Sequence, residues 1–119
     1  MYRVTKTMEI AGAHNLHLDY GSKCENLHGH NWIIKVTCAC CDHELDHNGM
    51  VMDFTHIKKA VQDRFDHQYL NQIEPFKSGL NPTAENMAKY ICDTVPHCVE
   101  VSVQESEGNV ATYIKEAQV

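Results

Sequence analysis

One segment, residues 28–41, constrains the fold more than any other part of this chain of 119 residues. Apolar side chains occupy alternate positions within it: Trp32, Ile34, Val36 and Cys38. This period of two is typical of a β-strand with one buried face. His28 and His30 have the same parity as those apolar residues, so we expect both imidazoles to project from the buried face.

A third histidine lies close to this pair in the sequence. His14 follows the first predicted strand, so its imidazole can join those of His28 and His30 from a neighbouring strand. Three imidazoles are a set that holds zinc when a fourth coordination position stays open for chemistry. Iron, nickel and copper also accept imidazole, but we favour Zn²⁺. The alternative is three unrelated surface histidines in a chain that contains nine.

Cys24 is the reactive side chain just outside this histidine cluster. A nearby cation favours the thiolate over the thiol, and Lys23 adds a second positive neighbour. We therefore favour Cys24 as a catalytic base or nucleophile. Two alternatives remain: an ordinary buried thiol, or a fourth zinc ligand that closes a structural site of one cysteine and three histidines.

Two further positions carry acidic or imidazole groups that suit catalysis. Asp66 and His67 follow the first predicted helix, where an acid and an imidazole can form a proton relay, although such pairs also arise by chance. Glu105 shares the parity of the valines in its strand, and an unpaired carboxylate on a buried face is costly. A ligand with a flat, guanidine-like edge would satisfy it. The alternative is a Glu at a strand end that reaches solvent.

The pattern of the whole chain predicts the order ββααββ. Strands are expected from Tyr2 to Ile10, from His28 to Cys41, from Val99 to Glu105 and from Val110 to Ile114. Helices are expected from Asp53, as N-cap, to Phe65, and from the Asn81-Pro82 start to Pro96. We therefore expect an α+β fold within one domain, residues 1–119, with a four-stranded antiparallel sheet and two helices on one face.

Composition excludes several classes of protein. The net charge is −6 and no run of Lys or Arg is present, which argues against nucleic-acid binding. No apolar stretch is long enough for a signal peptide or a membrane span, so we expect a cytoplasmic protein with reduced thiols. A second metal site of Cys38, Cys40 and Cys41 with His43 or His47 is difficult to build, because strand parity separates Cys41 from the other two.

Seven blocks of sequence, in this order, carry a resemblance to a known family. They are Ala13-His14, Lys23-Cys24 to His30-Asn31, Gly49 to Phe54, Asp66-His67, Leu70-Asn71, Asn81 to Asn86, and Glu105. Through them the chain resembles the 6-pyruvoyl-tetrahydropterin synthase / 6-carboxytetrahydropterin synthase family over essentially its whole length.

The resemblance implies a tunnelling fold (T-fold), in which subunits assemble through their sheets into trimers and two trimers stack as a homohexamer. Active sites then lie between subunits. His14, His28 and His30 would bind zinc, and Cys24 would abstract the proton. His67, supported by Asp66, would be the relay acid/base. Glu105 would anchor the pterin, and Lys23 is a candidate contact for the triphosphate. The implied substrate is 7,8-dihydroneopterin triphosphate, and no redox cofactor is needed.

Spacing separates the branches of this family. The pyruvoyl-forming branch usually has a longer insert between the cysteine and His-Gly-His, whereas this chain has only three residues there. The resemblance therefore favours a lyase that forms 6-carboxytetrahydropterin in the queuosine pathway and releases acetaldehyde. The pyruvoyl-forming enzyme is the alternative, and a closed zinc-binding module is the non-enzymatic one. Cys24 argues against a folate-related branch. The chain departs from the family at Ile10, Gly12 and Ser106, where an aromatic residue, Ala and Thr are frequent.

Overall fold

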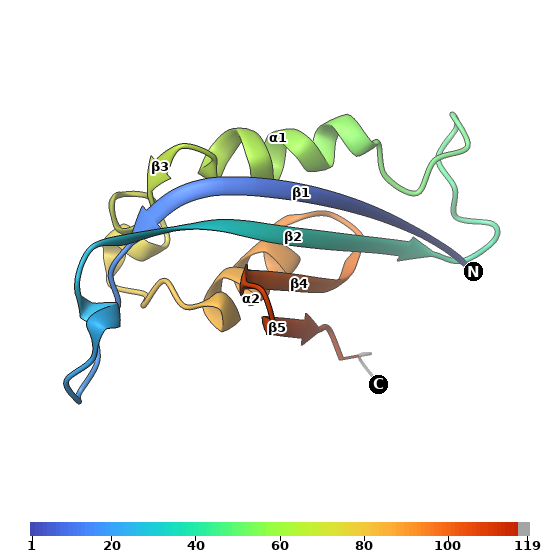
Figure 1. Ribbon diagram of the computed structural model, residues 1–119. Helices are drawn as coiled ribbons and strands as arrows, with labels where there is room; N and C mark the ends of the chain where they lie inside the picture. Colours follow the sequence, from blue (N-terminus) through green and yellow to red (C-terminus); the bar gives the residue numbers. More distant parts are fainter. Residues whose placement is uncertain (117–119) are drawn as a thin grey trace.

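The computed structural model describes residues 1–116 as two helices packed on one curved sheet (Figure 1). The strands are β1 (Tyr2–His14), β2 (His28–Cys40), β3 (Gln68–Tyr69), β4 (Cys98–Ser106) and β5 (Asn109–Ile114). The α-helices are α1 (Phe54–Phe65) and α2 (Ala84–Thr94). Three short 3-10 helices are η1 (Lys23–Glu25), η2 (Leu70–Gln72) and η3 (Phe76–Ser78). No helix within residues 1–116 is long and apolar enough to cross a membrane.

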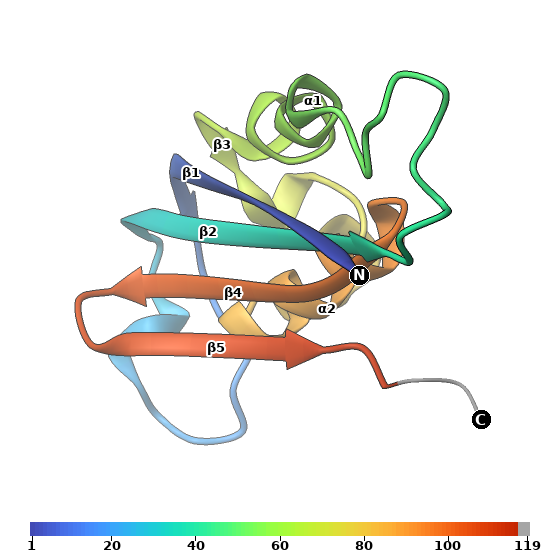
Figure 2. The same cartoon turned by 90° about the vertical axis from the view of Figure 1, so that its right-hand side faces the viewer.

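The sheet has five strands in the order β3-β1-β2-β4-β5, and Figure 2 shows the last four side by side. The predicted order of the four long strands and two helices is confirmed, but the prediction of a purely antiparallel, four-stranded sheet was wrong. The additional strand, β3, runs parallel to β1. It has two residues, so no periodicity could reveal it. It forms because the chain turns back after α1 at His67, whose φ is 59° and whose N–H donates to the Ala11 carbonyl.

The first strand is longer than predicted. It continues beyond Ile10 to His14 because β1 and β2 pair without interruption from Tyr2 opposite Cys40 to His14 opposite His28. Alternation in the sequence is lost over 11–13, where small residues replace large apolar ones, but the backbone hydrogen bonds to β2 persist. His14 is therefore the last residue of a strand, with its partner His28 directly across from it.

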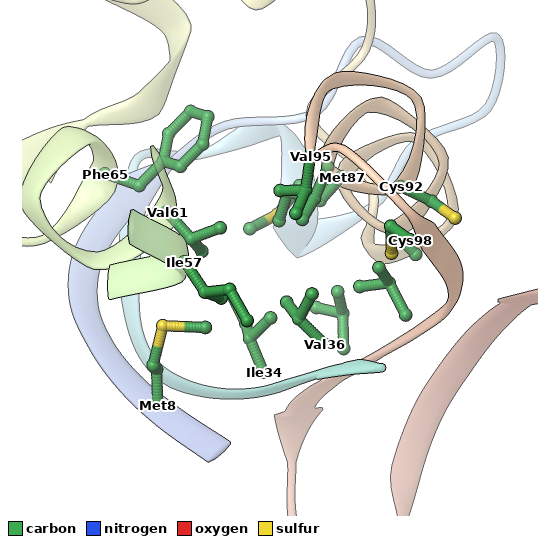
Figure 3. Packing of buried hydrophobic residues seen from close by; sticks show 14 of the residues in the cluster. Met8, Ile34, Val36, Ile57, Val61, Phe65, Met87, Cys92, Val95 and Cys98 are labelled. Atoms are coloured by element: carbon green, nitrogen blue, oxygen red, sulfur yellow. The ribbon is translucent and has the colours of Figure 1, made fainter. Parts of the chain in front are cut away.

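The two helices begin and end close to the predicted positions. Asp53 caps α1 as expected, since its carboxylate accepts a hydrogen bond of 2.8 Å from the Thr55 N–H. The second helix starts at Ala84 rather than at Asn81-Pro82, because the Thr83 hydroxyl is the group that caps it. Both helices turn their apolar stripes towards the same face of the sheet, as Figure 3 shows.

The alternating residues of β2 form the centre of the core. The predicted apolar face is fully buried: Trp32, Ile34, Val36 and Cys38. Cys38 lies beside Cys98 and Cys92, under α2, so it is a packing residue of the core, whereas Cys41 is exposed. Burial, together with the neighbouring Cys98, raises the pKa of Cys92 to about 12, so that thiol stays protonated at neutral pH.

Gly12 lies where β1 closely approaches the backbone of β3 and the side chain of Trp32. A methyl group at this position would lie 3.0 Å from the Gln68 carbonyl oxygen and 3.2 Å from the Trp32 ring. An alanine at this position would therefore not fit between Trp32 and Gln68 without movement of β3.

We predict that Gly12→Ala lowers the free energy of unfolding by about 1–3 kcal/mol, because overpacking forces β3 away from β1. Urea unfolding followed by circular dichroism measures the change. Gly21→Ala is the matched control, since no heavy atom lies within 4 Å of a methyl group there. Equal free energies of unfolding for the two variants would show that β3 moves to admit the methyl group without loss of stability.

Candidate metal centre and active site

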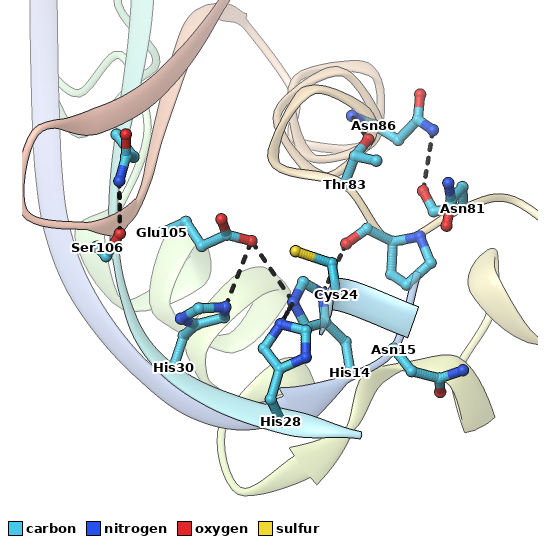
Figure 4. A network of polar contacts seen from close by, with 12 residues as sticks. His14, Asn15, Cys24, His28, His30, Asn81, Thr83, Asn86, Glu105 and Ser106 are labelled. Atoms are coloured by element: carbon cyan, nitrogen blue, oxygen red, sulfur yellow. Dashed lines mark hydrogen bonds and ion pairs between the residues drawn. The ribbon is translucent and has the colours of Figure 1, made fainter. Parts of the chain in front are cut away.

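Three histidine side chains meet at the end of the β1–β2 pair. His14 ends β1, and His28 and His30 begin β2, all on the buried face of the sheet. The Nε2 atoms of His14 and His28 are 3.0 Å apart, and one ring nitrogen of each of the three residues lies within 4.8 Å of the others. The structure thus brings together the three residues that the sequence predicts as metal ligands (Figure 4).

Hydrogen bonds fix which ring nitrogens face the centre of this cluster. His14 donates from Nδ1 to the Pro82 carbonyl at 2.8 Å, and His28 donates from Nδ1 to the Asn26 carbonyl at 2.7 Å. A carbonyl only accepts, so the proton of each neutral ring is on Nδ1 and the Nε2 lone pair points inward. Two facing lone pairs at 3.0 Å repel one another, and a cation bound between them would remove that repulsion.

Burial keeps the imidazoles of His14 and His30 in the form that binds metals. His14 is fully buried, and burial lowers the pKa of His14 and of His30 below the ordinary value of 6.5. Neutral imidazole is therefore the dominant form at neutral pH, as metal ligation requires. The Nε2 atom of His30 is buried and has no hydrogen-bond partner within residues 1–116. The donor set and this orphaned nitrogen fit a divalent cation such as zinc.

Glu105 brings a carboxylate to the same place. Its Oε1 atom lies 3.5 Å from Nε2 of both His14 and His30, and the side chain is 29% exposed. The parity argument placed Glu105 on the buried face of β4, and the structure agrees. Sequence reasoning did not anticipate that it would reach the histidines. The carboxylate also borders an open pocket of about 460 Å³ between the start of α2 and the β4–β5 hairpin.

Cys24 lies in η1, in the loop that joins β1 to β2. The Ser22 hydroxyl caps this turn by accepting a hydrogen bond of 3.2 Å from the Cys24 N–H. Figure 4 shows the thiol of Cys24 facing the histidines and Glu105. Cys24 is half-buried, whereas Lys23 is exposed. The thiol therefore belongs to the same site as the three imidazoles.

Asp66 and His67 lie elsewhere in the same chain. Asp66 accepts a hydrogen bond of 2.9 Å from the Ala11 N–H, and its other oxygen lies 3.5 Å from Nε2 of His67. The Asp66 carboxylate therefore lies beside the His67 imidazole. The His67 side chain is 82% exposed at the β3 edge of the sheet and lies outside the histidine cluster. A single chain thus leaves this pair apart from the metal centre.

Two contributors to the site were missed by sequence reasoning. The carbonyls of Pro82 and Asn26 orient His14 and His28, but any residue can supply a carbonyl, so no side chain signals the role. The Asn81-Pro82 block was interpreted only as a helix start. Its hydrogen bonds to the segment after His14 show that it also supports the site.

Comparisons of the sequence with known proteins identify its relatives. Residues 3–116 match the family described as 6-pyruvoyl tetrahydropterin synthase. The chain is 32% identical over 125 residues to 6-carboxy-5,6,7,8-tetrahydropterin synthase of Bacillus subtilis, a match that covers 94% of this chain and 84% of that protein. It is 29% identical to human 6-pyruvoyl tetrahydrobiopterin synthase, covering 93% of this chain and 90% of that protein.

A solved structure has the same fold. The 6-pyruvoyl tetrahydropterin synthase of Caenorhabditis elegans superposes with a TM-score of 0.74 and 28% sequence identity. The match covers 97% of this chain and 96% of that one, so the fold is shared along nearly the whole length.

We predict that His28→Ala abolishes tight zinc binding, because it removes one of three converging nitrogens. Isothermal titration calorimetry of the metal-free protein with zinc measures the change. The control is His56→Ala, which removes an exposed imidazole from α1. If His28→Ala bound zinc with the affinity of the parent protein, the zinc site would lie elsewhere in the chain.

Proposed function

Since the chain belongs to the 6-pyruvoyl tetrahydropterin synthase family, we propose that it is a zinc-dependent pterin synthase. The proposed reaction converts 7,8-dihydroneopterin triphosphate to 6-carboxy-5,6,7,8-tetrahydropterin with release of acetaldehyde and triphosphate, a step towards queuosine. The observation that carries the proposal is the cluster of three inward-facing Nε2 atoms beside the Glu105 carboxylate.

Each residue of the site has a role in this proposal. Zinc bound by the three histidines would polarise hydroxyl groups of the substrate side chain and acidify the adjacent protons. The Cys24 thiolate removes such a proton, for which its place beside the cluster is suited. His67, oriented by Asp66, supplies the second acid/base group. Exposed Lys23 is a candidate contact for the triphosphate.

The pocket beside Glu105 suits the pterin ring. A pterin presents a guanidine-like edge, and a carboxylate can accept two parallel N–H donors from such an edge. The pocket extends from Glu105 along the start of α2, with Ala84 and Glu85, and along the β4–β5 hairpin. A ring held there would lie next to the histidine cluster, because Glu105 Oε1 is 3.5 Å from Nε2 of His14 and of His30.

We further propose that the complete site forms between subunits of a homohexamer built from two trimers. The order of strands supports this. The relay pair lies at the β3 edge of the sheet, and the pocket lies at the β4–β5 edge. When copies join edge to edge, the β3 side of one copy meets the β5 side of the next. That meeting would bring His67 of a second copy to the Glu105 pocket of the first.

Two relatives support different products. The Bacillus subtilis protein is named for the carboxy product, and the human protein is named for pyruvoyl tetrahydrobiopterin. The short spacing between Cys24 and His28 favours the first product, and the pyruvoyl-forming reaction is the alternative. A closed module in which Cys24 is a fourth zinc ligand is the non-enzymatic alternative.

We predict that the zinc-loaded protein, incubated with 7,8-dihydroneopterin triphosphate, releases acetaldehyde and 6-carboxytetrahydropterin in equal amounts, as mass spectrometry can measure. Formation of 6-pyruvoyl-tetrahydropterin would instead establish the alternative product. The matched variant is Cys24→Ala, which should lose turnover while zinc content stays at the parent level. If Cys24→Ala lost zinc as well, Cys24 would be a ligand and the closed module would be supported.

We predict that Glu105→Gln weakens the binding of a pterin without triphosphate, such as neopterin, by about tenfold or more. A hydrogen bond to a charged group contributes about 1.5–3 kcal/mol, and Gln keeps the shape while losing the charge. Fluorescence titration of the zinc-loaded protein measures the affinity. Glu107→Gln, an exposed residue of the β4–β5 turn, is the control. Unchanged affinity in Glu105→Gln would place the pterin elsewhere.

A further inference from the structure

Two asparagine side chains bind the backbone that follows His14. Asn71 accepts a hydrogen bond of 3.0 Å from the Asn15 N–H and donates one of 2.9 Å to the Asn15 carbonyl. Asn81 accepts one of 2.9 Å from the His17 N–H and donates one of 2.9 Å to the His17 carbonyl. Each amide therefore pairs with one residue through both backbone groups, as a neighbouring β-strand would. We call Asn71 and Asn81 the amide clamp.

The amide clamp is itself held in place. The Asn81 carbonyl accepts hydrogen bonds from the Asn86 side chain at 2.9 Å and from the Thr83 N–H at 2.8 Å. Figure 4 shows Asn81, Thr83 and Asn86 at the start of α2, beside the histidine cluster. The adjacent Pro82 carbonyl binds His14. One end of α2 thus supports both a metal-ligand candidate and the chain that follows β1.

The residue between the two clamped positions connects to Cys24. Leu16 lies between Asn15 and His17, and its N–H donates a hydrogen bond of 2.8 Å to the Cys24 carbonyl. Within residues 1–116 this is the one backbone hydrogen bond that joins η1 to a segment outside its own turn. The two side-chain amides therefore hold the backbone on both sides of the N–H that binds Cys24.

We propose that Asn71 and Asn81 are positioning residues that set the place of the Cys24 thiol relative to the three histidines. The inference rests on the proposed function, in which Cys24 removes a proton from the substrate. Proton transfer requires the thiolate to lie within hydrogen-bond reach of its target, and a small displacement is costly in rate. The histidines lie on paired strands and do not depend on the clamp for their backbone positions.

The kinetic test combines Asn81→Ala with a change at Cys24. Asn81→Ala should lower kcat by at least about tenfold while KM changes less and zinc stoichiometry stays at the parent level. Cys24→Ser keeps a weak proton acceptor and so a residual rate. In that background Asn81→Ala should lower kcat by no more than about twofold, because the weak acidity of the Ser hydroxyl, rather than its position, then limits proton transfer.

A second test needs no substrate. In a Cys40→Ser/Cys41→Ser background, the three cysteines of the core are buried and Cys24 is the accessible thiol. Asn81→Ala and Asn71→Ala should each speed alkylation of Cys24 by iodoacetamide by about threefold or more, because the thiol is freed from its half-buried position. Asn48→Ala is the matched control, since the Asn48 side chain makes no hydrogen bond within residues 1–116.

The outcomes separate this proposal from the proposed function. Faster alkylation in a protein inactive on the pterin would support the clamp and contradict the function. If Asn81→Ala lowered kcat equally in the presence and absence of Cys24, or left the alkylation rate unchanged, the positioning role of the amide clamp would be wrong. The proposed enzymatic function would be unaffected by that result. If Asn81→Ala does not fold, Asn81→Asp tests the same bond: it keeps the acceptor for the His17 N–H and replaces the donor to the His17 carbonyl by a charged oxygen that repels it.

Discussion

The uninterrupted antiparallel pairing of β1 and β2 is the constraint on which the rest of the structure depends. It extends from Tyr2 opposite Cys40 to His14 opposite His28. Side chains on a strand alternate between faces, so a slip of one residue would move His28 and His30 to the open face. The apolar residues that follow them fix the register, because they fill the core under both helices. The burial of hydrophobic side chains therefore positions the polar site.

The site places neutral and charged groups where each is tolerated. Burial disfavours the charged form of His14 and His30. The Nδ1 groups of His14 and His28 donate to backbone carbonyls, which directs those protons away from the centre. Glu105 is partly exposed, so its carboxylate remains solvated on one side while it faces the histidines on the other. A dication bound by three neutral imidazoles would gain a nearby negative charge. That charge is equally available to the guanidine-like edge of a pterin.

The sequence predicted those parts of the molecule whose structure depends on the type and spacing of residues within one segment. Alternation in β2 predicted its buried face, and parity placed Glu105 on the inner side of β4. Asp53 was recognisable as an N-cap because its side chain performs that role locally. The strand β3 and the carbonyl of Pro82 could not be predicted, since both depend on contacts between segments more than fifty residues apart. The adjacency of Asp66 and His67 allowed a proton relay without favouring it over chance, and only the family resemblance assigned that role to His67.

The amide clamp also bears on how the branches of this family can differ. Cys24 is held through Leu16, which precedes it, rather than through the residues that lead to His28. An insertion between Cys24 and His28 would therefore lengthen the loop on the side away from Leu16, where the Asn26 carbonyl binds the His28 ring. The clamp, the cysteine and the first histidine would keep their relative positions, because all three are fixed by β1, η2 and the start of α2. Under the proposed function, the length of the loop after the cysteine could then alter the space around the substrate side chain while Cys24 keeps its place beside the histidines.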